Sequence, residues 1–156
     1  MKSKTKAIIV SIAIPLAVGG LSALITSGGM DTFEKLNKPP LSPPGWLFPI
    51  VWTILFIMMG IASYLVYAAD EKLAVRTRAL IVYAVQLGVN FFWSIFFFSF
   101  KWYLFSFFWL LLLWALIIFT TIKFYRISKT AAYLMVPYLL WVTFAGYLNL
   151  SISLLN

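Results

Sequence analysis

The sequence predicts an all-α integral membrane protein, built as a bundle of five transmembrane helices. Three observations support this fold class. Hydrophobic residue types make up 63% of the 156 residues, and charged types make up only 10%. A soluble domain needs a polar shell, which so few polar residues cannot supply. The apolar residues also fall into five runs of about 20 residues or more, the length that crosses the hydrocarbon core of a bilayer.

The five runs predict helices over about 7–27, 46–69, 79–100, 102–122 and 131–155. The third and fourth belong to one stretch of 44 residues, Ala79–Ile122, in which Lys101 is the only charge. This stretch predicts two helices of about 21 residues joined by a tight turn at residues 100–102. Helices are required because an unpaired backbone polar group in lipid costs several kcal/mol. We expect a single membrane domain over residues 1–156.

The cationic residues predict the orientation of the bundle. The N-terminus and the connections 70–78 and 123–130 each carry three Lys or Arg and alternate onto one side, whereas the other side carries Lys35, Lys38 and Lys101. The positive-inside rule then predicts a cytoplasmic N-terminus and an extracytoplasmic C-terminus. A basic start before an apolar run also fits a signal peptide cleaved after Ala17-Val18-Gly19, although a run of 21 residues is longer than a usual h-region.

Several function classes are disfavoured by composition. The chain has no cysteine or histidine, which removes thiol chemistry and the commonest metal ligands, so no metal and no cofactor are expected. The spans contain no Asp, Glu, Lys or Arg, which disfavours ion-coupled transport. The net charge of +8 is explained by loops that flank membrane helices, and without a long basic stripe we expect no nucleic-acid binding.

Polar and tryptophan side chains inside the spans indicate an internal cavity. Gln86, Asn90 and Ser94 are spaced by four residues and share one helix face, which should point into the bundle. The alternative is that Gln86 and Asn90 only bond to a neighbouring helix. A second set comprises tryptophans deep in three spans, with aromatic or small neighbours at spacing four: Trp52 with Phe56, Trp93, and Trp141 with Ala145. Together these residues are expected to line an apolar cavity suited to a flat conjugated ligand.

The connection 28–45 is the longest in the chain and contains most of its prolines. Pro43-Pro44-Gly45 precedes the second span, where proline starts a helix at no cost in hydrogen bonds. Residues before proline are pushed toward extended backbone, so 38–45 is expected to be stiff. One interpretation is simply a rigid helix start. The other is a lid, in which Gly28–Leu41 folds over the outer mouth of the bundle and loses little entropy on ligand binding.

Three motifs, in order along the chain, resemble one known family. KPPLSPPGWLFPIVW (38–52), QLGVNFFWSIFFF (86–98) and PYLLWVTFAGYLN (137–149) are similar to the signature segments of the translocator protein family, also called tryptophan-rich sensory proteins or peripheral-type benzodiazepine receptors. The resemblance covers nearly the whole chain. It implies a five-helix bundle, usually dimeric, in a bacterial cell membrane, that binds porphyrins such as protoporphyrin IX and benzodiazepine-type drugs.

The resemblance also assigns site residues by position. The tryptophans implicated in porphyrin binding, and in light-dependent porphyrin breakdown in bacterial members, match Trp52 and Trp141. These two would be the catalytic residues if such breakdown occurs. The other ligand-binding positions that match are Pro43, Pro44, Phe56, Asn90, Trp93, Ser94 and Ala145.

Two departures from the family pattern change the expectations. Leu41 replaces a common loop tryptophan, which weakens the expected lid contacts. The C-terminal LNLSISLLN lacks the Tyr and Arg of the sterol-recognition pattern, so sterol binding is not expected, even though Leu65-x-Tyr67-x4-Lys72 fits the loose form of that pattern. A homodimer is expected through Ala84-x-x-x-Gly88 or Gly19-x-x-x-Ala23, where small residues let helices approach.

The function expected is therefore a membrane receptor for porphyrins. Two alternatives stay open: an enzyme that degrades porphyrin with light and oxygen, and a passive carrier or regulator that acts through a partner protein. In the enzyme, the photochemistry would come from the porphyrin itself.

Overall fold

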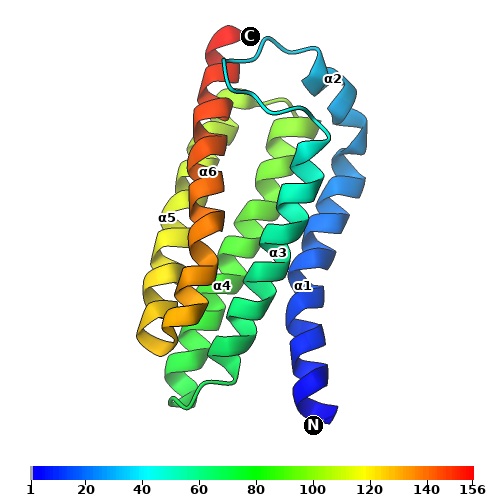
Figure 1. Ribbon diagram of the computed structural model, residues 1–156. Helices are drawn as coiled ribbons and strands as arrows, with labels where there is room; N and C mark the ends of the chain where they lie inside the picture. Colours follow the sequence, from blue (N-terminus) through cyan, green and yellow to red (C-terminus); the bar gives the residue numbers. More distant parts are fainter. Residues whose placement is uncertain (1) are drawn as a thin grey trace.

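The computed structural model describes residues 2–156 and consists of five long helices that run side by side (Figure 1). These are α1 (Lys2–Thr26), α3 (Leu47–Tyr67), α4 (Leu73–Ser94), α5 (Tyr103–Ile127) and α6 (Lys129–Leu155). All five are long and apolar enough to cross a membrane. The predicted fold class, an all-α integral membrane protein with five transmembrane helices, is confirmed.

The core lies among α3, α4, α5 and α6. The pairs α5–α6, α4–α5 and α3–α6 pack along their lengths, and they bury residues such as Met59, Gln86, Ile117 and Tyr138 completely. By contrast, α1 lies against α3 and part of α4, and it is the least buried of the five helices. One side of the bundle is therefore closed by a helix that packs mainly on α3 and leaves most of its surface exposed.

Contact between α1 and α3 depends on a glycine. A Cβ atom built on Gly60 would lie 2.5 Å from Cα of Ile12 and 2.7 Å from the carbonyl oxygen of Ser11. Both neighbours are backbone atoms, which cannot rotate away. Such close approach through small residues is a common way in which helices associate in lipid.

The helix ends differ from the expected ones because the apolar run marks only the part of a helix that lies in lipid. The first helix already begins at Lys2 rather than at residue 7, α4 begins at Leu73 rather than at 79, and α5 continues to Ile127. Lysine and arginine are good helix formers, so a helix continues through them into the headgroup region.

The turn between α4 and α5 lies at the expected place, but its geometry is unusual. Before it, α4 is extended by a π-helical turn, η2 (Ile95–Ser99), and Lys101 has a left-handed backbone with φ 58°. This residue lets the chain reverse before Tyr103. The connection 28–45 also contains structure that the sequence did not predict: a 3-10 turn, η1 (Ser27–Gly29), and a short helix, α2 (Met30–Glu34).

Both the α3–α4 and the α5–α6 connections lie at the end of the bundle that holds the N-terminus (Figure 1). The C-terminus and α2 lie at the opposite end. The three cationic segments noted in the sequence are thus gathered at one end of the molecule.

Candidate functional site

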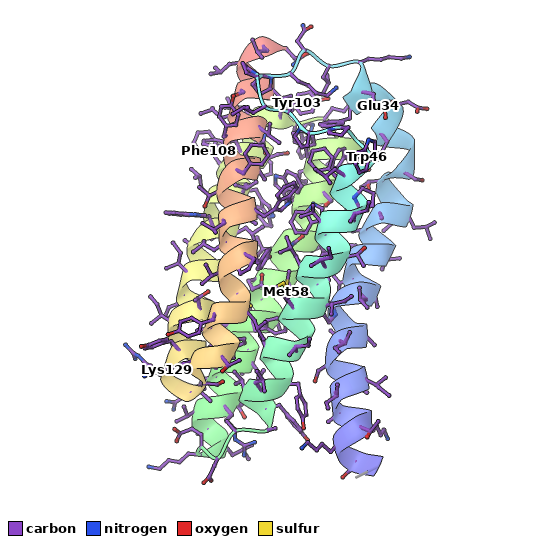
Figure 2. The ribbon with its side chains drawn as sticks, viewed as in Figure 1. Glu34, Trp46, Met58, Tyr103, Phe108 and Lys129 are labelled. Atoms are coloured by element: carbon purple, nitrogen blue, oxygen red, sulfur yellow. The ribbon has the colours of Figure 1, made fainter. Side chains whose placement is uncertain are left out.

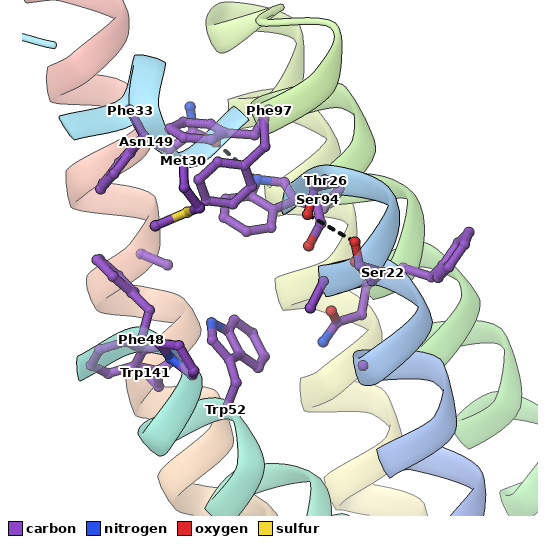
Figure 3. A pocket seen from close by; sticks show the side chains of 18 of the residues that line it. Ser22, Thr26, Met30, Phe33, Phe48, Trp52, Ser94, Phe97, Trp141 and Asn149 are labelled. Carbon is purple, nitrogen blue, oxygen red and sulfur yellow. Dashed lines mark hydrogen bonds between the residues drawn. The ribbon is translucent and has the colours of Figure 1, made fainter. Parts of the chain in front are cut away.

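A cavity of about 210 Å³ lies inside the bundle at the end that carries α2 (Figure 3). Its walls come from α1, α3, α4 with η2, and α6, and α2 covers it. Within residues 2–156, none of the residues that line it is charged. Its lining residues include Gly19, Ser22, Thr26, Met30, Phe33, Phe48, Trp52, Phe56, Asn90, Trp93, Ser94, Trp141, Ala145 and Asn149.

Three indole rings from three helices line this cavity. The ring of Trp52 stacks on Phe56, with centroids 5.5 Å apart, and points into the cavity toward Trp141 in Figure 3. Trp141 meets Phe48 edge to face at 5.9 Å. The ring of Trp93 stacks on that of Phe97, with centroids 5.3 Å apart. The walls are therefore mostly aromatic faces and edges, which suit a flat apolar ligand.

A buried chain of hydrogen bonds joins α4 to α6 below the cavity. The side-chain amide of Asn90 donates to the hydroxyl of Tyr138 at 2.7 Å, and that hydroxyl donates to Oε1 of Gln86 at 2.7 Å. Gln86 and Tyr138 are fully buried. Gln86 bonds to α6 and is not among the lining residues of the cavity, which fits the interpretation as a helix–helix contact, whereas Asn90 both bonds to α6 and lines the cavity.

A second polar link fixes Trp93. Its indole nitrogen donates to Oδ1 of Asn149 at 3.0 Å, and the amide of Asn149 donates to the carbonyl oxygen of Tyr103 at 2.8 Å. This link holds α4, α5 and α6 together beside the cavity. The orientation of Trp93 is therefore set before any ligand arrives.

Several polar groups at the cavity have no partner in the described part of the chain. The indole N–H of Trp141 is buried without an acceptor. Of the wall residues Ser22 and Ser94, neither side-chain hydroxyl takes part in a hydrogen bond within residues 2–156. A buried donor without a partner costs free energy, and a ligand that offers an acceptor removes that cost.

The segment 28–45 covers the cavity through α2 rather than through its prolines. Phe33 of α2 is 5% exposed, and the centroid of its ring lies 5.6–6.0 Å from those of Phe48, Phe97 and Phe98. Together with Met30 it forms part of the cavity wall.

The rest of the segment is fastened to the end of α6. The backbone N–H of Asn37 donates to Oδ1 of Asn156 at 3.1 Å, and the amide of Asn156 donates back to the carbonyl oxygen of Asn37 at 2.9 Å. The hydroxyl of Tyr147 donates to the carbonyl oxygen of Pro40 at 2.8 Å. The cover is therefore held at both its helical and its extended part.

Of the nine expected ligand-binding residues, seven line the cavity and two do not. Trp52, Phe56, Asn90, Trp93, Ser94, Trp141 and Ala145 are brought together. Pro43 and Pro44 are not lining residues. They shape the turn before α3, in which the N–H of Leu47 donates to the carbonyl oxygen of Pro44 at 3.0 Å. Their placement fits the rigid helix start, the other interpretation of this segment.

The sequence interpretation missed the wall formed by α1. Gly19 was proposed for a dimer contact, but a Cβ atom there would meet the ring of Phe56 in the same chain. Ser22 and Thr26 are buried beside it. Small and polar residues at 19, 22, 23 and 26 follow helical spacing, a signal that could have identified this face.

Comparison with known proteins agrees with the architecture. Residues 11–155 match the model of the TspO/MBR family. The chain is 40% identical over 146 residues to the tryptophan-rich protein TspO of Chlorobaculum tepidum, covering 93% of this chain and 92% of that protein. It is 36% identical to protein CrtK of Rhodobacter capsulatus, covering 92% and 89%. It is also 33% identical to the translocator protein of Bos taurus, covering 87% and 82%. A family match over nearly the whole chain, together with five membrane helices, leads to one conclusion: this chain is an integral membrane protein of the TspO/MBR family.

Proposed function

We propose that the cavity is a binding site for porphyrins of the protoporphyrin IX type and for benzodiazepine-type apolar drugs. The observation that carries the proposal is the convergence of Trp52, Trp93 and Trp141 on one uncharged cavity. Porphyrins are broad, flat and apolar, and they stack on indole faces. The unpaired N–H of Trp141 and the hydroxyls of Ser22 and Ser94 offer a few polar contacts to orient the ring.

The size of the cavity adds a requirement to this proposal. Ligand pockets usually measure about 300–1,000 Å³, and this one measures about 210 Å³. A tetrapyrrole therefore enters only if a wall moves outward. We expect α1 to be the wall that moves, because it is the least buried of the five long helices and packs mainly on α3 and α4. Binding should accordingly change the position of α1.

The proposal is tested by titrating protoporphyrin IX into the detergent-solubilised protein in the dark and following tryptophan fluorescence. The wild type should be quenched with saturation. Trp52→Phe/Trp141→Phe should bind about tenfold more weakly, because each stacking contact contributes roughly 0.5–1.5 kcal/mol. The matched control is Trp46→Phe/Trp102→Phe, since these residues are 68% and 53% exposed and are not among those that line the cavity. Equal affinities for all three proteins would place the porphyrin elsewhere.

The second candidate, an enzyme that degrades porphyrin in light, is favoured by the juxtaposition of Trp52 and Trp141 in the cavity. Oxygen and light would act through the bound porphyrin, and the two indoles would be oxidisable side chains in contact with it. The same titration under illumination separates the two functions. A receptor without this activity leaves the rate of porphyrin loss equal to that in empty detergent, whereas an enzyme accelerates the loss and is slowed by Trp52→Phe/Trp141→Phe.

We further propose that the protein lies in a bacterial cell membrane with its N-terminus in the cytoplasm, supported by the three cationic segments at one end. Accessibility of engineered cysteines to impermeant reagents tests the orientation.

A homodimer through α4 is supported by the outward placement of Ala84 and Gly88, since a Cβ atom on Gly88 would meet nothing within 4 Å. Gly88→Trp should shift the protein from dimer to monomer in light scattering, and an unchanged mass would exclude this interface.

A further inference from the structure

A second hollow lies on the outside of the bundle, along the seam between α5 and α6. It measures about 310 Å³ and shares no residue with the aromatic cavity. It lies beside the α5–α6 turn, at the end of the bundle that holds the N-terminus (Figure 2 labels Lys129 at this turn). We call this hollow the seam groove. It is lined by Thr121, Ile122, Tyr125 and Arg126 of α5 and by Ala132, Tyr133 and Val136 of α6.

The body of the seam groove is apolar and faces the lipid. Ala132 is buried and forms the floor, whereas Ile122, Tyr125 and Tyr133 are 47–62% exposed along the sides. From Arg126 the groove follows α5 back to Thr121, which at about 1.5 Å per residue gives a length of roughly 7 Å into the hydrocarbon. An acyl chain can lie along such a groove, whereas a water-filled path would need polar side chains.

The mouth of the seam groove is cationic. Arg126 lines it, and Nζ of Lys129 lies 5.8 Å from the centroid of the Tyr125 ring, which also lines it. The sequence contains no Asp or Glu after Glu71, so neither α5 nor α6 supplies an acidic partner. The N-terminus of α6 lies at the same place and adds its positive dipole end.

We propose that the seam groove binds an anionic phospholipid of the bilayer, with its phosphate between Arg126 and Lys129 and one acyl chain along Ile122 and Val136. The two tyrosines support this depth, because tyrosine prefers the headgroup boundary and Tyr125 and Tyr133 lie side by side with centroids 6.4 Å apart. A zwitterionic lipid could place its acyl chain in the groove in the same way, but its cationic headgroup atom would be repelled by Arg126 and Lys129 at the mouth. The groove therefore selects for headgroup charge.

The proposal is tested by native mass spectrometry of the full-length protein with an equimolar mixture of dioctanoyl-phosphatidylglycerol and dioctanoyl-phosphatidylcholine. The first bound lipid should be predominantly phosphatidylglycerol. Arg126→Gln/Lys129→Gln should reduce this preference by about fivefold for each neutralised cation. The matched control is Lys35→Gln/Lys101→Gln, which removes two exposed cations at the other end of the bundle and should keep the wild-type preference.

Two further arms separate a lipid site from simpler explanations. Val136→Trp fills the groove without changing charge and should lower the binding of both lipids, with folding checked by thermal melting. Inorganic phosphate at equal concentration should not displace the lipid. The proposal is overturned if the wild type shows no preference, if the control loses it as strongly as Arg126→Gln/Lys129→Gln does, if Val136→Trp binds lipid normally, or if phosphate alone competes fully.

Discussion

Gly60→Leu is expected to separate α1 from α3 and to lower the free energy of unfolding by about 3 kcal/mol. A Cβ atom at position 60 would lie 2.5 Å from Cα of Ile12 and 2.7 Å from the carbonyl oxygen of Ser11. Real Cβ atoms do not approach backbone so closely, and the rest of a leucine side chain has no space either. Because the obstacle is the backbone of α1, relief requires that the whole helix move.

Thermal unfolding in detergent measures this effect, and Gly20→Leu is the matched control. Gly20 lies on α1, where an added Cβ atom would meet nothing within 4 Å. Both substitutions gain the same helix propensity, about 1 kcal/mol, so their difference isolates the helix contact. Equal melting temperatures for the two variants would mean that α1 is not held through Gly60.

Tyr138→Phe is expected to destabilise the protein by about 2 kcal/mol. The hydroxyl accepts from the amide of Asn90 and donates to Oε1 of Gln86, both at 2.7 Å, in a fully buried setting. Its removal leaves the amide of Asn90 and Oε1 of Gln86 without this hydrogen-bond partner. The side-chain nitrogen of Gln86 already lacks a partner within residues 2–156. Stranded groups cost about 1–3 kcal/mol each, although interhelical hydrogen bonds in membranes average only about 0.6 kcal/mol.

Tyr147→Phe provides the comparison for this prediction. The hydroxyl of Tyr147 makes a single hydrogen bond, to the carbonyl oxygen of Pro40, and the residue is 41% exposed. Its loss should change stability by less than about 0.5 kcal/mol. The two variants are compared by chemical or thermal unfolding in the same detergent. A larger effect at Tyr147 than at Tyr138 would contradict the view that the buried α4–α6 link holds the core.

The features that the sequence predicted are those set by local chemistry. Lipid forces apolar spans to be helical, so five helices and the turn near Lys101 followed from composition and length alone. Polar residues avoid lipid, so the spacing of Gln86, Asn90 and Ser94 identified an inward face.

The features that escaped prediction depend on which helices become neighbours. The role of Gly19 is set by Phe56, which lies on another helix, and that of Phe33 by three rings from α3 and the end of α4. A motif of small residues does not say whether its partner helix belongs to the same chain or to a second copy. The prolines at 43 and 44 were assigned to the site by resemblance, and only the path of the chain shows that they stop short of the cavity.

We propose that one uncharged cavity, with indoles from α3, α4 and α6, receives a flat tetrapyrrole when α1 moves outward. The most direct measurement is an experimental structure of the protein with protoporphyrin IX bound. We expect ring density between Trp52, Trp93 and Trp141, beneath Phe33, with α1 displaced outward relative to α3. Porphyrin density on the lipid-facing surface, with the cavity and α1 unchanged, would contradict it.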